Sequence, residues 1–274
     1  MGPPVFPLGY GQARSEGKVM LLSEAAVLPR RPEASYDIAA AIAPLCATCH
    51  FQKLNFCGAL LRHDERQDWE PLQARHKAIV ARHNIYRAGE PSEGVQVVCD
   101  GWAVRFIQLP NGKRQILSVI MPGDLISPMA LFEQNFSYSV QAVTDVRYAT
   151  FPFAEVRKRM RENPALLDLW IRLTAAEHRH ADRRLVDLGQ RTAQERIAGL
   201  IVHVMQRAQA RGDIADDIFT LPMNQQQIAD FTGLTPVHTC RVLSALRKAK
   251  VCDVGHGLVK VIDSAELLRI AAFK

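Results

Sequence analysis

The chain has 274 residues, 48% of them hydrophobic and 23% charged, which is the balance of a globular protein with one large domain or two ordinary ones. This balance excludes collagen-like, low-complexity and wholly disordered proteins, and no apolar run approaches the roughly 18–20 residues that a membrane-spanning helix needs. The net charge of +6 is compatible with a polyanionic partner, and without a secretory signal in residues 1–10 we expect a cytoplasmic protein with no membrane partner.

Residues 1–75 are predicted to be an N-terminal extension that carries a cysteine motif. Residues 1–35 are rich in Pro, Gly and small polar side chains and show no sustained period, so no domain is expected to start there. Residues 36–61 are apolar and contain cysteines, and residues 68–83 are predicted to form a helix with few apolar side chains.

The cysteines of this extension have the spacing of a metal or cluster site. Cys46 and Cys49 form a Cys-x-x-Cys pair, and Cys57 follows after seven intervening residues. A disulfide framework is not expected in the reducing cytosol, whereas two thiolates at this spacing can bind one metal or cluster that further thiolates complete. Zinc binding, thiol redox sensing and simple packing of buried thiols stay open as alternatives. His50 completes a sequence typical of haem attachment in exported proteins, so haem is not favoured here.

Residues 76–160 are predicted to form a small antiparallel β-roll that acts as a sensor domain. Short apolar or alternating runs recur about every ten residues, with glycines between them, which is typical of antiparallel strands. Pro110, Asn111 and Gly112 mark a hairpin, since Asn-Gly favours the primed turns. The expected strands cover residues 95–98, 102–109, 115–121, 137–143 and 146–151.

Residues 161–210 are predicted to contain a long helix that is broken near Gly189 and resumes over residues 192–207. Asn163 and Pro164 are a helix start signal, because Pro is tolerated at an early helical position. The stripe along this helix fits either packing on its own domain or a dimerisation seam, and the length of the helix favours the seam. Its residues are Leu166, Trp170, Leu173, Glu177 and Leu188.

Residues 211–274 are predicted to form a winged helix-turn-helix. Asn224 begins a capping box, Gly233 can end the first helix in the left-handed region, and Thr235 with Pro236 can start a second helix. Residues 255–262 fit a two-stranded wing. An ordinary helical hairpin with a solvated basic face is the alternative, but the capped helices, the turn glycine and the basic wing together favour DNA binding.

The outer face of the second predicted helix carries donors that can enter a major groove about 12 Å wide. Arg241 is the best candidate for a base contact, because its planar fork matches two acceptors of guanine. His238 and Arg247 share the outer surface, and amides at the helix N-termini suit phosphate. Cys240 and Cys252 are expected to be structural, although Cys240 could touch DNA.

The order of these elements resembles the CRP/FNR superfamily of bacterial transcription regulators. The resemblance covers roughly residues 75–270 and implies an α+β fold with a cupin-like, cyclic-nucleotide-binding-domain-like roll. It further implies a homodimer on a pseudo-palindromic site of double-stranded promoter DNA, with RNA polymerase as a partner. The stretches that carry it are YRAGE (86–90), CDG (99–101), LPNGKRQIL (109–117), MPGDL (121–125), AQERIA (193–198) and LTPVH (234–238), together with Arg241.

The resemblance assigns roles to individual positions of the helix-turn-helix. The phosphate-contacting first helix falls on Asn224 and Gln226, the recognition helix starts at Thr235, and the arginine at the base edges is Arg241. Many members carry Glu one turn before that arginine, where Val237 stands in this chain. Because Val cannot accept a hydrogen bond from cytosine, we expect a half-site that differs from the common one.

The resemblance also bears on the effector. Members that bind cyclic nucleotides use a Gly-Glu-Leu turn and a following Arg, whereas this chain has Gly123, Asp124 and Leu125 and no Arg in residues 136–139. A cyclic phosphate buried without a cation would be costly, so cyclic AMP is not expected. The alternative to a regulator that oxygen or redox switches through its cysteines is an effector-independent or small-ligand-responsive regulator whose cysteines are structural.

Oxygen-sensing members hold a [4Fe-4S] cluster with three N-terminal cysteines and a fourth in the roll. In this chain Ala149 occupies the usual fourth position, and Cys99 is the only cysteine of the roll that could replace it. The expected ligands are therefore Cys46, Cys49, Cys57 and Cys99. A different class, an enzyme or a small-molecule-binding protein, is disfavoured because no carboxylate pair, Ser/His/Asp arrangement or phosphate loop is visible.

Overall fold

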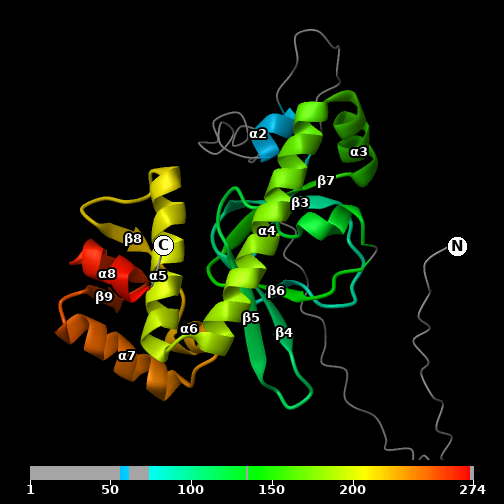
Figure 1. Ribbon diagram of the computed structural model, residues 1–274. Coiled ribbons are helices and arrows are strands. Elements are labelled where there is room, and N and C mark those ends of the chain that lie inside the picture. The colour runs from blue at the N-terminus through cyan, green and yellow to red at the C-terminus, as the bar shows by residue number, and fades with distance from the viewer. Residues whose placement is uncertain (1–55, 62–73, 134, 272–274) are drawn as a thin grey trace, which may run out of the picture. The chain divides into compact units, whose positions relative to one another are not determined.

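The computed structural model describes residues 56–61, 74–133 and 135–271, which Figure 1 traces in colour along the chain. Residues 75–151 contain the strands β1 to β7, helices dominate residues 153–211, and short strands and helices follow after that. The expected α+β order of antiparallel roll, long helix and winged helix-turn-helix is confirmed. Among the helices in these ranges, none has the length and apolar composition that crossing a membrane requires.

The roll consists of two antiparallel sheets. One has the order β1 (Arg75–Ile79), β7 (Val146–Phe151), β3 (Val95–Asp100). The other has the order β2 (Asn84–Tyr86), β6 (Ser139–Ala142), β4 (Ala103–Gln108), β5 (Arg114–Ile120). The five strands expected from alternating apolar runs are therefore present, because the glycines and turn residues between them end each run where the chain must reverse. A 3-10 turn, η2 (Pro128–Leu131), follows β5.

The expected helix over residues 68–83 is wrong where the structure describes it. Residues 75–79 form β1, and Arg75 pairs with Thr150 at the start of an antiparallel ladder with β7. The sequence is polar and lacks alternation because β1 is an edge strand whose side chains are mostly exposed or half-buried. Backbone pairing with β7 therefore outweighs the helical propensity of Ala, Arg and Lys.

The hairpin between β4 and β5 turns at the expected residues, but its geometry is not the expected primed turn. Gly112 has a φ of 80°, and among the described residues with positive φ Asn111 is not found. The amide of Gly112 donates to Leu109 O at 2.9 Å, and the amide of Leu109 donates to Lys113 O at 2.8 Å. This is the three-residue hairpin in which a turn is closed by a left-handed glycine.

Two helices follow the roll. The helix α3 (Phe153–Glu162) leads into α4 (Pro164–Gln190), and the side chain of Asn163 accepts the amides of Ala165 and Leu166 as the N-cap. The short helix α2 (Phe56–Leu61) packs beside α4, with the rings of Phe56 and Trp170 edge to face at 5.0 Å. Figure 1 shows α2 and α3 near the N-terminal end of α4.

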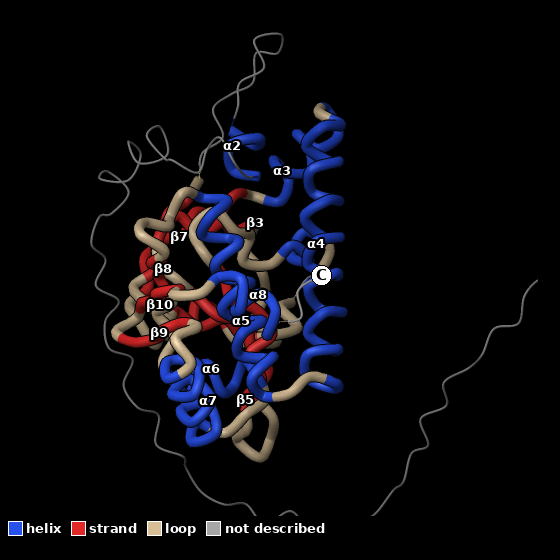
Figure 2. The backbone as a smooth tube through the Cα atoms, turned by 60° about the vertical axis from the view of Figure 1, so that its left-hand side comes forward, coloured by secondary structure: helices blue, strands red, loops and turns tan. Residues whose placement is uncertain are grey.

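The long helix ends at Gln190, as expected near Gly189, and α5 (Ala193–Arg211) begins after a new capping box at Thr192. The buried face of α5 packs with the C-terminal elements, which are β8 (Ile218–Thr220), α6 (Gln225–Thr232), α7 (Pro236–Lys248), β9 (Cys252–Gly255), β10 (Leu258–Val261) and α8 (Ser264–Ile270). The strands form a sheet of order β8, β10, β9, of which the sequence predicted only the last two. Figure 2 shows these helices and strands gathered around α5.

The predicted seam stripe of α4 contacts the rest of its own chain, and its two buried members, Leu166 and Trp170, are not available to a second copy. Leu166 and Trp170 are only 1% and 2% exposed and belong to a core cluster with residues of β3 and β7, and Leu173 packs against that cluster. The 3-4 spacing marks a buried face, but it does not specify whether the same chain or a second copy covers that face.

The other two members of the stripe also contact their own chain. Glu177 accepts a hydrogen bond from Arg105 of β4. Leu188 lies beside the turn between α6 and α7, where a Cβ atom on Gly233 would come within 2.8 Å of Leu188 Cδ2. The inner face of α4 thus spans from the roll to the helix-turn-helix.

Candidate nucleic-acid interface and interior cavity

The outer face of α7 presents the predicted DNA-contacting side chains to solvent. Thr235 caps the helix by accepting the amide of His238 at 3.2 Å, and Pro236 occupies the first turn as expected. His238 and Arg241 are exposed, and Val237 is 62% exposed one turn before Arg241. The opposite face is anchored by Val242 and Leu246 in the core, so α7 is held rigidly with this polar face outward.

The preceding helix is fixed by local chemistry. Asn224 and Gln227 form the predicted capping box, with each side chain bonded to the backbone amide of the other residue. Gly233 ends α6 with a φ of 67°, a conformation that favours glycine, and the crowding by Leu188 would exclude a larger residue there. Asn224 and Gln226 are both exposed at the start of α6, where backbone amides can bind phosphate.

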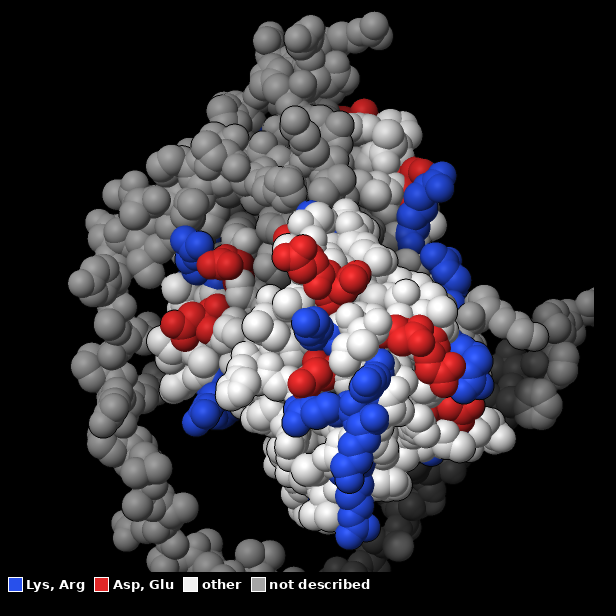
Figure 3. All heavy atoms as spheres, turned by 90° about the vertical axis from the view of Figure 1, so that its left-hand side faces the viewer, with Lys and Arg blue, Asp and Glu red and all other residues white. Residues whose placement is uncertain are grey.

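Arg247, another predicted DNA contact, is tied to the wing. Its Nε donates to Asp253 Oδ1 at 2.7 Å, and its Nη2 donates to Val254 O at 3.2 Å. The wing itself turns through His256 and Gly257, both with positive φ. Figure 3 shows this side of the molecule, where Lys and Arg side chains occupy the lowest part of the face and acidic side chains lie higher.

A chain of polar contacts links the start of α6 to the roll. Gln226 Nε2 donates to Asp230 Oδ1 at 2.7 Å, and Arg114 of β5 donates to the other carboxylate oxygen of Asp230 at 2.8 Å. The side-chain amide of Gln115 donates to the carbonyl oxygens of Asp230 and Phe231 at 2.7 and 3.1 Å. A predicted phosphate contact is therefore connected to a strand of the sensor domain.

The carbonyl end of α6 is also held by arginines of α4 and α5. Arg184 donates to Phe231 O, and its guanidinium carbon lies 3.7 Å from the centroid of the Phe231 ring. Arg196 donates to Thr232 O at 3.3 Å. Cations are favourable at this end of a helix, because the last carbonyl groups have no partner within the helix.

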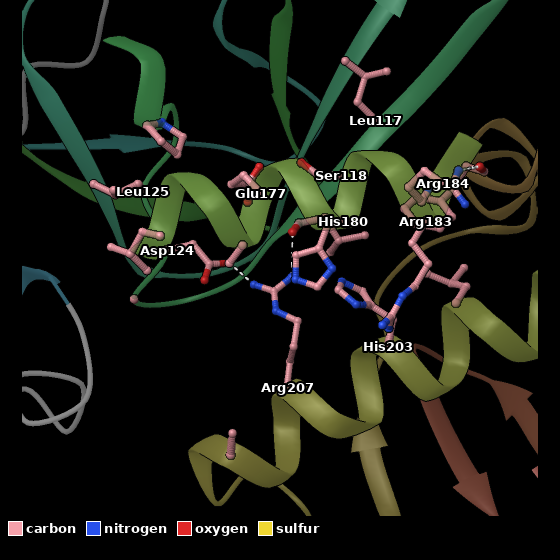
Figure 4. A pocket seen from close by; sticks show the side chains of 18 of the residues that line it. Leu117, Ser118, Asp124, Leu125, Glu177, His180, Arg183, Arg184, His203 and Arg207 are labelled. Atoms are coloured by element: carbon pink, nitrogen blue, oxygen red, sulfur yellow. Dashed lines mark hydrogen bonds and ion pairs between the residues drawn. The ribbon is translucent and has the colours of Figure 1, made fainter. Parts of the chain in front are cut away.

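A cavity of about 500 Å³ lies between β5, α4 and α5. Figure 4 shows Glu177, His180 and Arg184 approaching it from α4, and His203 and Arg207 from α5. Its lining includes five arginines and three carboxylates, as well as apolar side chains such as Leu125. The cavity is thus a polar, positively charged space at the junction of the sensor domain and the helices that lead to α7.

Asp124 lies in the turn that the sequence analysis compared with the cyclic-nucleotide-binding turn. In the structure its carboxylate binds two arginines of α5. Arg207 donates to its carboxylate, and Arg211 does so at 2.8 Å. Asp124 Oδ2, the oxygen that Arg207 contacts, also accepts the amide of Met121 at 2.7 Å. The carboxylate thereby ties the turn after β5 to the helix that carries the C-terminal unit.

His203 and His180 meet edge to face inside the cavity, with ring centroids 4.9 Å apart. Burial lowers the pKa of His203 to about 3, and the positive charge of Arg207 acts in the same direction. Burial also lowers the pKa of His180. Both imidazoles are therefore neutral at pH 7 and can donate or accept hydrogen bonds without adding charge.

Arg105 is a deeply buried cation, at 8% exposure. Its Nε donates to Ser118 Oγ at 2.6 Å, one Nη donates to Tyr138 Oη at 3.3 Å, and the other donates to the Glu177 carboxylate. Burial alone would lower the pKa of Arg105, but Glu177 and Tyr138 raise it above its ordinary value. The side chain stays charged and fastens β4 to α4.

The cysteines fall into two groups. Cys46 and Cys49, like His50, lie outside the described residues, and of Cys57 only its place in α2 is described. Cys99 is half-buried, with Sγ 3.8 Å from Val97 O. Within residues 56–61, 74–133 and 135–271, no three His, Cys, Asp or Glu side chains are grouped as metal ligands.

The two C-terminal cysteines differ in environment. Burial raises the pKa of the Cys252 thiol to about 11, which fits the predicted structural role. Cys240 is exposed on α7 next to Arg241.

Sequence reasoning missed Arg105, His203 and the Asp124 contacts. Arg105 leaves one signal, since it interrupts an otherwise apolar run between Val104 and Phe106. The other contacts join residues far apart in the chain, and nothing in their local sequence indicates a partner.

Comparison with known protein families divides the chain in the same way as the structure. Residues 77–163 match the cyclic nucleotide-binding domain, and residues 195–270 match the Crp-like helix-turn-helix domain.

Individual relatives match most of the chain. The transcriptional activatory protein AadR of Rhodopseudomonas palustris is 30% identical over 230 residues, which cover 83% of this chain and 93% of that protein. The nitrogen fixation regulation protein FixK of Bradyrhizobium diazoefficiens is 28% identical over 228 residues, covering 83% and 94% respectively. The solved structure of FixK2 from Bradyrhizobium japonicum has the same fold, with a TM-score of 0.67 at 24% identity, and the match covers 74% of this chain and 100% of that one.

Proposed function

Because the chain belongs to the CRP/FNR family of DNA-binding transcription regulators, we propose that it acts as a homodimer on a two-fold symmetric promoter site. The observation that carries this proposal is the outward face of α7, where Arg241 and His238 are exposed on a helix anchored from behind. The name of the AadR relative supports activation as the sign of control. Such a regulator works in the cytoplasm with the chromosome, and RNA polymerase stays a predicted partner.

The test is a gel shift with genomic fragments, followed by footprinting of the retained fragments. A symmetric dimer should protect two half-sites about one helical turn apart, because the two recognition helices enter successive major grooves on one side of the duplex. Binding should weaken steeply with salt, since phosphate contacts release counterions. Retention of every fragment with equal affinity, and no defined footprint, would contradict a sequence-specific regulator.

The dimer itself is proposed to form through the outer face of α4. Leu167, Ile171 and Leu185 are 42%, 57% and 70% exposed, which is unusual for apolar side chains on one helix. Together with Thr174, His178 and Ala181 they follow alternating steps of four and three residues, the spacing of a coiled-coil seam. A second copy of α4 would cover this stripe and leave the inner face on its own roll.

We also propose that the N-terminal cysteines and Cys99 hold a [4Fe-4S] cluster that makes DNA binding sensitive to oxygen. The support from the described residues is that α2, which carries Cys57, inserts Phe56 and Leu60 into the core cluster against which Cys99 packs. Arg159 donates to Leu60 O at 2.6 Å and helps to fix α2 there. Bound in this place, a cluster would supply oxygen-sensitive iron chemistry close to the start of α4.

Protein purified without oxygen should then be brown and contain about four irons per subunit. It should lose colour and DNA binding in air. Cys99→Ser should lower the iron content, whereas Cys252→Ser serves as a matched control because that thiol is buried in the winged unit. Colourless anaerobic protein that binds DNA equally well in air would contradict the cluster and favour zinc, thiol packing or constitutive control.

Cyclic AMP is not proposed as the effector, although residues 77–163 match the cyclic nucleotide-binding domain. The support is that the Asp124 carboxylate is already bound by Arg207 and Arg211, and the buried Arg105 is already bound by Glu177. Equilibrium dialysis with labelled cyclic AMP tests this directly, and saturable micromolar binding would contradict it.

A further inference from the structure

We propose that Arg105 forms a buried site for a single carboxylate between the roll and α4, and that Glu177 of the same chain occupies this site as a built-in ligand. The proposal goes beyond the proposed function, because it concerns how α4 is held against the sensor domain without an added effector. Only its consequence for DNA binding rests on the proposed function.

Four segments of the roll build the site around the guanidinium group. Arg105 comes from β4 and Ser118 from β5, while Tyr138 precedes β6 and donates to Ser127 Oγ at 2.6 Å before η2. The guanidinium carbon also lies 5.3 Å from the centroid of the Tyr138 ring. These neutral partners orient the cation, but they leave its charge without a counterion inside the roll.

The counterion comes from the helix. The side chain of Arg105 is 10% exposed, and the Glu177 carboxylate is the acidic group that binds it. A buried guanidinium without an anion is unfavourable, so the pair selects the position of α4 in which Glu177 reaches β4. The Glu177 carboxylate therefore fixes the position of α4, as an acidic small molecule would do in a sensor that a bound ligand controls.

The site is reachable from outside. The Glu177 side chain is 42% exposed, and both Glu177 and Ser118 line the 500 Å³ cavity. Because Glu177 both lines this cavity and binds Arg105, removing its side chain would open a path from the cavity to the guanidinium group. A small carboxylate such as acetate could then enter and replace the lost group.

The consequence is that α4 packs on the roll in the absence of any diffusible effector. Since α4 also contacts the carbonyl end of α6 through Arg184, a fixed α4 holds the helix-turn-helix in one position. The regulator would then bind DNA in its unliganded state, and control would have to act elsewhere in the chain.

Chemical rescue tests the site. Glu177→Ala should lower the melting temperature by roughly 4–8 °C, because it leaves a buried cation unpaired. Sodium acetate at 100 mM should restore roughly 2–4 °C of this loss relative to sodium chloride at the same concentration and pH 7.5. The wild-type protein should show no acetate-specific rise, because Glu177 fills its site.

The matched control is the double variant Arg105→Met with Glu177→Ala, which keeps the open space and removes the cation. It should not respond specifically to acetate. An equal response of this double variant, or of the wild-type protein, would overturn the proposal, as would a folded Glu177→Ala variant that ignores acetate.

Glu177→Gln keeps the size of the side chain and covers the case in which Glu177→Ala does not fold. Hydrogen exchange in β4 and in the middle of α4 should accelerate in this variant, because a neutral amide cannot replace the carboxylate. Unchanged exchange would overturn the proposal.

The consequence for DNA binding has a separate readout. Wild-type protein purified without oxygen and dialysed exhaustively to remove small molecules should bind a duplex selected from random sequences as tightly as undialysed protein. A loss of affinity that a cell extract filtrate restores would overturn effector independence. If no duplex is selected at all, the DNA-binding proposal fails, while the acetate experiment still decides the Arg105 site.

Discussion

Single side chains decide what the protein reads on DNA. Arg241 is exposed on α7, and the position one turn earlier holds Val237 instead of an acidic group. Val237 offers no acceptor to a cytosine amino group, so Arg241 is the main candidate for direct base readout at this surface.

Replacing Arg241 with Ala should therefore cost about 1–3 kcal/mol of binding free energy and relax the preference at one base position in each half-site. Gln226→Ala is the matched comparison, because its assigned contact is to phosphate and its loss should weaken all duplexes about equally. Competition gel shifts with single-base variants of the selected site measure both effects. Unchanged specificity of Arg241→Ala would show that another residue of α7 reads the bases.

At the same scale, the sequence predicted the residues whose chemistry is local. Asn163, Asn224 and Thr235 cap helices because their side chains bind amides only two or three residues away. Arg105 could not be predicted in its role, because its partners Ser118, Tyr138 and Glu177 are distributed over the following 72 positions. Only the folded roll brings them together.

Among the elements, α4 carries two apolar stripes that differ in register by one residue. The inner stripe includes Leu166 and Trp170 and is buried in its own domain, while the outer stripe includes Leu167 and Ile171 and is exposed. Both have the 3-4 spacing of a helical interface, so the spacing alone could not distinguish which stripe a second copy would cover. The strand β1 shows the opposite case, in which an edge position removes the periodic signal altogether.

Charging the outer stripe should dissociate the dimer. Ile171→Glu would place an unpaired carboxylate from each subunit in the interface, raising the dimer dissociation constant by about 100-fold or more. The monomer should keep its fold because Ile171 is 57% exposed. Analytical ultracentrifugation over a concentration series measures the constant.

Two further variants locate the interface. Ala165→Glu adds the same charge at an exposed position off the stripe and should leave the dimer intact. Leu173→Glu charges the inner stripe and should lower the melting temperature, because Leu173 packs against the core of its own domain. A dimer that survives Ile171→Glu at low micromolar concentration would place the interface on another surface.

For the whole molecule, the important feature is that the sensor domain and the DNA-binding unit share polar contacts. Asp124 joins the roll to α5, and Asp230 joins α6 to β5. His203 lies in the same junction, surrounded by Arg207, His180, Arg184 and Arg183. The stability of the junction therefore depends on His203 staying neutral.

Stability should fall as the pH is lowered. His203 has a pKa of about 3 when folded and about 6.5 when unfolded, so the unfolded chain binds more protons between these values. The contribution of neutral His203 to the free energy of unfolding is complete above pH 6.5 and is lost as the pH falls toward 3. From pH 7.5 to 5.5 the free energy of unfolding should drop by about 1 kcal/mol from this group, and His76 and His180 add in the same direction.

Urea denaturation at the two pH values measures this change. His203→Gln should reduce the pH dependence of the free energy of unfolding, because it removes the buried ring that only the unfolded chain protonates in this range. An equal pH dependence in wild type and His203→Gln would mean that other groups cause it.

The part of α4 between Glu177 and Leu188 connects Arg105 at one end with the turn at Gly233 at the other. One inserted residue would rotate everything after it by about 100°, which exchanges the inner stripe for the outer one. Seven inserted residues would nearly restore the rotation, but they would lengthen the helix by about 10.5 Å and carry Leu188 past its turn. Both the rotation and the length of the helix therefore exclude insertions and deletions between Glu177 and Leu188. We expect changes in chain length to occur instead in the loops of the roll and the wing.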